Sequence, residues 1–157
     1  MSNDTAARTA SGIATGAFFE ALATEMNAHP ERFTVLGDCD MVAALAMRQD
    51  DGSAFVVQIV FEELRCENVS VTDLDGALLA DYWLDGPMAA WQTMFDDIVT
   101  HGAATGRLTI NSLTLLGDDI RLRGNDPMGV DKFSRFNQTL QEYFDGAART
   151  HTNDTEN

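Results

Sequence analysis

The residues best suited to acid and base chemistry are His101 and the two aspartates shortly before it, Asp96 and Asp97. A carboxylate and an imidazole can pass a proton to and from a substrate when both lie within hydrogen-bond reach of it. At the end of a predicted helix, however, His101 can instead bind the last carbonyl groups and the negative end of the helix dipole. The two hypotheses are an enzymatic pair and a structural histidine.

Other catalytic motifs are missing from the sequence. It contains no Gly-x-Ser-x-Gly, GxGxxG, P-loop or HExxH pattern, so acyl hydrolysis by a nucleophile elbow, dinucleotide chemistry, nucleotide use and zincin chemistry lack their motifs. We therefore predict no catalytic residue and no cofactor, and favour a non-catalytic binding protein over an enzyme.

The candidate metal ligands are also poorly arranged. Cys39 and Cys66 lie far apart and have no Cys/His spacing of the zinc type, which predicts two buried free thiols. Aspartate pairs at 50–51, 96–97 and 118–119 offer oxygens that a hard cation prefers, but such pairs are typical of turns and solvated faces. We predict no metal site.

Two cations, Arg121 and Arg123, alternate with Ile120 and Leu122. In a strand they would point away from the apolar pair. A guanidinium can bind a carboxylate or phosphate head group at the mouth of a ligand site, or pair with the many acids of the chain.

The charge of the chain limits its partners. Asp and Glu outnumber Lys and Arg by 25 to 10, which gives a formal net charge of −15. Such a surface repels nucleic acid and anionic bilayers, so we predict neither as a partner. The polar start of the chain and the lack of a long apolar run predict a cytoplasmic protein without membrane insertion.

The length of 157 residues predicts one domain. Residues 1–14 and 147–157 are rich in small polar residues and have the composition of flexible tails. Residues 15–146 are predicted to form the domain.

Periodicity predicts the elements of this domain. Helical spacing predicts a first helix that ends near His29 and Pro30, and alternation predicts a hairpin around a turn at 49–53. A further short strand runs into Gly86 and Pro87, a helix follows up to Gly102, and short alternating stretches flank a turn at 117–119. A last helix is predicted from Asp131 onward. The order predicts an α+β domain with an antiparallel or mixed sheet covered by helices.

The succession "ADYWLDGPMAAWQTMFDDI", "IRLRGNDPMG" and an apolar C-terminal helix resembles the sterol carrier protein type-two (SCP-2) lipid-binding family over residues 18–145. Ile120, Leu122, Gly124, Asn125 and Met128 match a family pattern in which a strand, a glycine and a methionine precede a closing helix. The resemblance implies about five strands and helices around an apolar tunnel, closed by the last helix.

The same resemblance implies a small intracellular carrier that binds a sterol or steroid, a fatty acid or a fatty acyl-CoA without covalent chemistry. Nine Phe, seven Met and two Trp supply adaptable apolar surface for such a ligand. The predicted ligand-binding residues are Trp83, Trp91, Met94, Phe95, Ile98, Met128, Phe133, Phe136, Leu140 and Phe144.

Two alternatives remain open at this point. The first is the small α+β enzyme, an isomerase or hydratase type, which requires an aspartate and His101 to converge inside the cavity. The second is an oligomerisation module, such as a homodimer, whose aromatic face is covered by another chain. An aromatic and methionine stripe can also be ordinary core packing, because burial stabilises it by about 25 cal/mol per Å² without any ligand.

Overall fold

The computed structural model describes residues 12–117 and 119–150, so the outer parts of both predicted tails and Asp118 lie outside the described residues. Its elements, in chain order, are α2 (Gly16–Ala28), α3 (Glu31–Thr34), β1 (Cys39–Arg48), β2 (Ala54–Glu63), β3 (Arg65–Thr72), α4 (Leu74–Ala77), β4 (Tyr82–Pro87), α5 (Met88–His101), the 3-10 turn η1 (Gly106–Leu108), α6 (Ile110–Leu115), β5 (Arg121–Arg123) and α7 (Pro127–Asp145).

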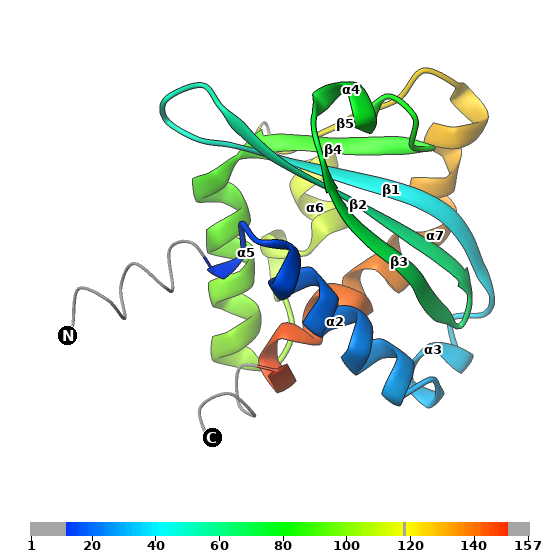
Figure 1. The fold of residues 1–157 in the computed structure, drawn as a ribbon. Helices are drawn as coiled ribbons and strands as arrows, with labels where there is room; N and C mark the ends of the chain where they lie inside the picture. Colours follow the sequence, from blue (N-terminus) through cyan, green and yellow to red (C-terminus); the bar gives the residue numbers. More distant parts are fainter. Residues whose placement is uncertain (1–11, 118, 151–157) are drawn as a thin grey trace.

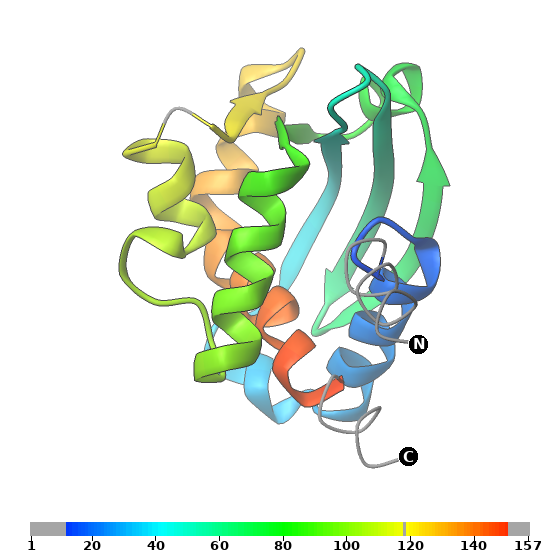
Figure 2. The same cartoon turned by 90° about the vertical axis from the view of Figure 1, so that its left-hand side faces the viewer.

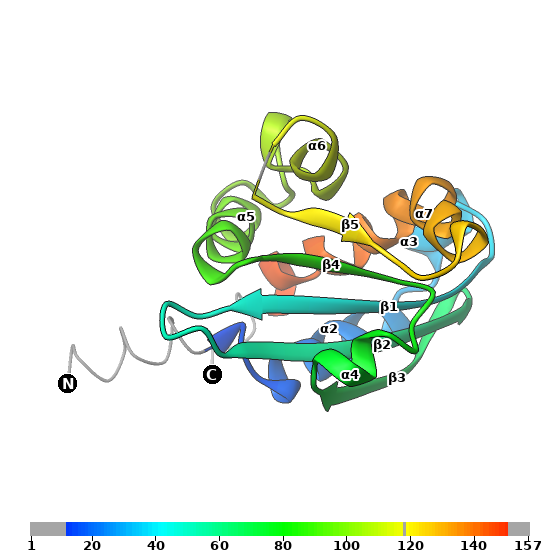
Figure 3. The same cartoon turned by 90° about the horizontal axis from the view of Figure 1, so that it is seen from above.

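The five strands form one mixed sheet in the order β3-β2-β1-β4-β5 (Figures 1 and 3). The pairs β1/β2, β2/β3 and β4/β5 are antiparallel. Strands β1 and β4 are parallel, and the chain between them passes through β2, β3 and α4. The predicted α+β class and the five-stranded mixed sheet are confirmed.

The predicted hairpin joins β1 to β2. Gln49 donates its backbone N–H to the Ser53 oxygen at 2.8 Å, and the Asp51 carboxylate accepts the Ser53 N–H at 2.9 Å. Gly52 has φ 91°, a left-handed conformation that glycine adopts without steric cost. The run after it, which alternation predicts as a single strand, turns at Glu63, where φ is 56°, and becomes both β2 and β3.

Two further boundaries differ from the prediction. The alternating residues Leu108 and Ile110 lie in η1 and α6 instead of a strand, because the Thr109 hydroxyl caps α6 by accepting the Ser112 N–H at 3.2 Å. The last helix begins at Pro127, not at Asp131. Asp126 is its N-cap, with the Met128 N–H at 3.0 Å from the carboxylate, and proline suits the first helical position.

The two faces of the sheet are covered differently. Helices α2, α5 and α7 lie on one face of the sheet, which we call the inner face (Figure 1), and their buried side chains belong to the main core. Helices α5, α6 and α7 stand side by side next to the sheet (Figure 2). On the opposite, outer face lies a small cluster of Ala44, Ala46, Val56 and Ala77 under α4.

Contacts extend slightly past both predicted domain limits. Ile13 is 4% exposed and Ala147 is 2% exposed. Arg149 lies 3.3 Å from the Glu25 carboxylate of α2. None of the helices within the described ranges combines the length and the hydropathy of a membrane-spanning segment.

Candidate functional site

The inner face of the sheet is apolar because successive strand residues alternate between the two faces. In β1, Met41, Leu45 and Met47 belong to the main core, whereas Ala44 and Ala46 belong to the cluster on the outer face. All of these side chains are fully buried. The inner-face residues of β1 form the sheet side of an apolar layer.

Helix α5 supplies one wall of this layer. Trp91, Met94, Phe95 and Ile98 recur at three- and four-residue steps and are at most 2% exposed, as expected for one face of a helix. Gly102 ends the helix in the left-handed conformation, with its N–H bonded to the Ile98 oxygen at 2.7 Å. The predicted bounds and apolar face of this helix are confirmed.

Helix α7 supplies a second wall. Phe133, Leu140 and Phe144 are at most 2% exposed and belong to the same core. Phe136 is only partly buried at its margin, with the Arg135 guanidinium carbon 5.1 Å from its ring centroid. The structure therefore brings seven of the ten predicted ligand-binding residues into one layer, and Phe136 to its edge.

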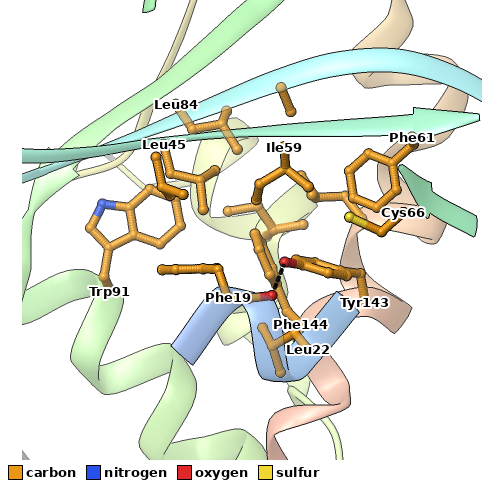
Figure 4. Close-up of a cluster of buried hydrophobic side chains, with 14 of the residues drawn as sticks. Phe19, Leu22, Leu45, Ile59, Phe61, Cys66, Leu84, Trp91, Tyr143 and Phe144 are labelled. Carbon is orange, nitrogen blue, oxygen red and sulfur yellow. Dashed lines mark hydrogen bonds between the residues drawn. The ribbon is translucent and has the colours of Figure 1, made fainter. Parts of the chain in front are cut away.

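Phe144 contacts other aromatic rings of the layer (Figure 4). Its ring centroid lies 5.4 Å from Phe95 and 6.3 Å from Trp91, at interplanar angles of 71° and 86°. Phe95 in turn lies 6.3 Å from Phe19 of α2. Such edge-to-face pairs are each worth about 0.5–1.5 kcal/mol beyond area burial. The layer is continuous from α2 through α5 to α7.

The polar groups of the layer have partners within the chain. The Tyr143 hydroxyl donates to the Phe19 oxygen at 2.8 Å, and the Trp91 indole N–H donates to the Ala46 oxygen at 3.2 Å. The Tyr82 hydroxyl lies 3.1 Å from the Met41 sulfur. Burial raises the pKa of both tyrosines well above 10, so they remain neutral. What these residues present to a ligand is apolar surface.

The two cysteines contribute no reactive thiolate to this layer. Both are free and buried, which confirms their prediction. Burial raises the pKa of the Cys39 thiol to about 12 and that of the Cys66 thiol to about 11. Since the thiolate is the nucleophile and the metal ligand, neither cysteine is suited to those roles at neutral pH. Within the described ranges, no group of three or more His, Cys, Asp or Glu could hold a metal ion.

Two predicted ligand-binding residues lie elsewhere. Trp83 packs with the alanine cluster on the outer face, because it is one residue before the inward-facing Leu84 of β4. Met128 is 78% exposed in the first turn of α7. The structure brings neither of them to the apolar layer.

The two predicted head-group contacts are also on the outer face. Arg123 is paired with Trp83 and Arg121 with Asp85 across β4 and β5, and opposed residues of antiparallel strands share a face. The intervening Leu122 packs against the inner core. The sheet therefore separates both guanidiniums from the apolar layer.

Several residues of the layer were not predicted as site residues, namely Phe19, Leu22, Met41, Leu45, Met47, Ile59, Phe61, Leu84 and Tyr143. Phe19 and Leu22 could have been found from their helical spacing, and Tyr143 from its place beside Phe144 in the stripe. For the strand residues the available signal was alternation, which does not say which face the helices cover.

The acid and base candidates do not meet in the layer. His101 is 55% exposed, and its Nδ1 lies 2.8 Å from Asp97 Oδ1. Asp97 also accepts the Thr105 N–H at 2.7 Å. Bonds from Thr105 and from His101 hold the pKa of the Asp97 carboxyl below its usual value. The Asp97 carboxylate therefore links the end of α5 to Thr105 in the following loop.

One further acid, the partly buried Asp145, was not predicted from the sequence. Its carboxylate accepts the Ala104 N–H at 3.1 Å and the Gln141 amide N–H at 2.9 Å. Burial raises its pKa to about 6. The Gln141 side-chain oxygen also accepts the Ile110 N–H at 2.6 Å. These bonds fasten the segment between α5 and α6 to the last helix.

Comparison with known proteins identifies the fold. No protein-family profile matches the sequence, and no curated protein matches it either. The chain is similar to a crystal structure of sterol carrier protein 2, with a TM-score of 0.65 and 19% identity over 86% of this chain and 96% of that one.

A second similar structure is the solution structure of a conserved hypothetical protein from Thermus thermophilus, whose description suggests a sterol carrier protein. It gives a TM-score of 0.66 and 19% identity over 87% of each chain. The chain therefore has the sterol carrier protein 2 fold, as the resemblance in its sequence predicted.

Proposed function

We propose that this protein is a non-covalent carrier of a hydrophobic molecule, which binds between the inner face of the sheet and helices α2, α5 and α7. The observation that carries the proposal is the single apolar layer between these elements. Aromatic side chains contribute to it from each of them, and methionine side chains from the sheet, α2 and α5. The proteins that share the fold include one named sterol carrier protein 2, which supports a lipid-like ligand.

The layer has the properties that an adaptable ligand site needs. Met26, Met41, Met47 and Met94 are all buried in it, and methionine re-packs around ligands of different shape because it is unbranched and polarizable. A sterol, a fatty acid or the acyl chain of a fatty acyl-CoA would replace contacts that the aromatic side chains now make with one another. We place the ligand body against Trp91, Phe95 and Phe144.

Helix α7 is the proposed cover of the site. Its buried face contributes Phe133, Leu140 and Phe144, whereas Ser134 and Arg135 on the same helix are exposed. A helix with one apolar face loses contacts on that face alone when it moves away from the sheet. Release of α7 would therefore open the layer while the five strands stay paired.

The enzymatic alternative receives less support. It requires an aspartate and His101 to converge inside the ligand site, whereas His101 is more than half exposed and bonds to Asp97 at the end of α5. The oligomerisation alternative requires the aromatic stripe to be covered by another chain. Within this single chain, Phe133, Leu140 and Phe144 are already buried.

The proposal is tested by native mass spectrometry of protein purified from its own host, followed by organic extraction and identification of what was bound. A co-purifying lipid, sterol or acyl-CoA is the expected result. Titration with palmitic acid, palmitoyl-CoA and cholesterol would then rank the ligand classes. Protein that carries no lipid and binds none of these three probes would overturn the proposal.

We expect such a carrier to work in the cytoplasm and to present its ligand to partner enzymes.

A further inference from the structure

Three arginines gather on the outer face of the sheet, at the edge where β1 and β4 end and β5 begins. They are Arg48, Arg121 and Arg123, and together with Asp85 and Trp83 they form what we call the arginine surface. The chain has ten Lys and Arg residues and a net charge of −15. Three of its few cations therefore share one small area.

Asp85 orders two of these arginines. Its carboxylate accepts from Arg48 Nε at 2.6 Å and from Arg48 Nη2 at 2.9 Å. Arg123 Nε lies 3.3 Å from Asp85 Oδ2, the oxygen that Arg48 Nη2 also binds. A bidentate bond holds a guanidinium plane in a defined orientation. The Asp85 carboxylate is only 9% exposed, whereas the Arg48 and Arg123 side chains are 44% and 47% exposed.

Arg121 adds a third positive charge. It lies directly opposite Asp85 in the pairing of β5 with β4, so both side chains stand on the same face. In the part of the chain that the structure describes, no acid lies within 4.0 Å of the Arg121 guanidinium, and Asp85 is the one acid within that distance of Arg48 or Arg123. Three guanidiniums and one carboxylate leave this surface two positive charges in excess.

The lack of a side chain at Gly86 lets the start of β5 lie close to the end of β4. A Cβ atom at Gly86 would lie 2.9 Å from the Asp119 oxygen and 2.8 Å from a side-chain carbon of Ile120. Any residue larger than glycine would push the start of β5 away from β4. Gly86 thus allows the approach that sets Arg121 beside Asp85.

The composition and exposure of the surface fit a protein partner. Trp83 is partly buried and is the cross-strand neighbour of Arg123, and Trp and Arg are the residue types that most often dominate binding energy at interfaces. The side chains of Arg48 and Arg123 are open to solvent over nearly half of their area. A small anion there would stay hydrated, whereas a partner chain would cover the guanidiniums and exclude water.

We infer that the arginine surface is a docking site for an acidic segment of a partner protein. Paired carboxylates of that segment would bind the guanidiniums of Arg121 and Arg123, and its backbone would lie over Trp83. The rest of this acidic chain would repel the same segment, so complementary charge selects both the partner and the face. The sheet separates this surface from the apolar layer, so the inference does not depend on whether a lipid binds there.

The test uses the full chain and, as probe, a synthetic peptide of alternating glutamate and serine that is blocked at both ends. NMR of isotope-labelled protein should show saturable shifts of the Arg48, Arg121 and Arg123 side-chain N–H signals and of the Trp83 indole. Added salt should weaken the binding, because charges are screened over about 8 Å at physiological ionic strength. Arg121→Glu should weaken it about tenfold, since it replaces attraction by repulsion.

Arg65→Glu is the matched control. Arg65 is 59% exposed on β3, where it pairs with Glu67, so this variant changes the net charge equally but away from the arginine surface. Equal loss in both variants would overturn the inference, as would a peptide that leaves all four signals unmoved. The inference also fails if inorganic phosphate shifts the signals and the peptide does not, because the occupant would then be a small anion. It fails as well if dilution of the protein alone moves the signals, because the occupant would then be a second copy of this chain. Thermal unfolding of both variants checks that each remains folded.

Discussion

The Tyr143 hydroxyl of α7 donates a hydrogen bond to the backbone oxygen of Phe19 in α2, at 2.8 Å, inside the apolar layer. Both residues are at most 1% exposed, and they lie 124 positions apart in the chain. This bond joins the first and last long helices beneath the sheet (Figure 4). It is one of the contacts that α7 would have to release to open the layer.

Removing this hydroxyl should destabilise the protein. We expect Tyr143→Phe to lower the free energy of unfolding by about 1 kcal/mol, because a buried hydrogen bond is lost while the ring stays in place. The matched control is Tyr82→Phe, whose hydroxyl meets the Met41 sulfur, a weak acceptor. Urea unfolding of both variants measures the difference. An equal loss in both would contradict a special role for the bond between α2 and α7.

The two tryptophans should report differently on a bound lipid. Trp91 lies in the apolar layer and Trp83 on the opposite face of the sheet. In Trp83→Phe, where Trp91 is the single tryptophan, palmitic acid should change the fluorescence in a saturable way. In Trp91→Phe, where Trp83 remains, the same titration should give little change. A response from Trp83 alone would move the ligand site to the outer face.

Two methionines that sequence analysis treats alike should differ in their effect on stability. Met94 is fully buried, whereas Met128 is 78% exposed. Met94→Ala should cost about 2–5 kcal/mol of unfolding free energy, because it leaves a cavity in the layer. Met128→Ala should change it by less than about 0.5 kcal/mol. Comparable losses on chemical denaturation would show that Met128 packs against the core.

Asp145 should make the protein less stable as the pH rises. Burial lifts its pKa from the ordinary value of 3.8 to about 6, so between these values the folded state binds a proton that the unfolded state has released. Its contribution to stability is therefore present below about pH 4 and is lost as the pH rises through about 6. Asp145→Asn should remove this slope, measured as the unfolding midpoint against pH.

Asp97 provides the control with the opposite sign. Its pKa is lowered in the folded state, so its contribution is present at neutral pH and is lost as the pH falls through the folded value. Asp97→Asn should therefore reduce the fall in the unfolding midpoint as the pH is lowered. Asp145→Asn should instead reduce the fall in the midpoint as the pH is raised. Slopes that change in the same direction in both variants would contradict these assignments.

Much of the fold could be predicted where its signals are local. Helix α5 lies between Pro87 and Gly102, two residues whose backbone preferences mark a helix start and a helix end regardless of the surroundings. The hairpin at 49–53 contains Gly52 with a positive φ, and α2 ends at Ala28, with its C-cap His29 immediately before Pro30. By contrast, the turn at Glu63 has no glycine or proline, and only the pairing of β2 with β3 reveals it.

The sequence by itself determined the class of the fold, its main helices and the apolar stripes of α5 and α7, because helical spacing and end signals act within a few residues. Only the tertiary structure decided which apolar and basic residues share a site. Alternation places Trp83 and Leu84 on opposite faces of β4, but it cannot say which face the helices will cover. Packing of α2, α5 and α7 against one side put Leu84 in the core with Trp91. The same packing left Trp83, Arg121 and Arg123 on the other side. Residues two positions apart in a strand share a face, whereas adjacent residues point to opposite faces.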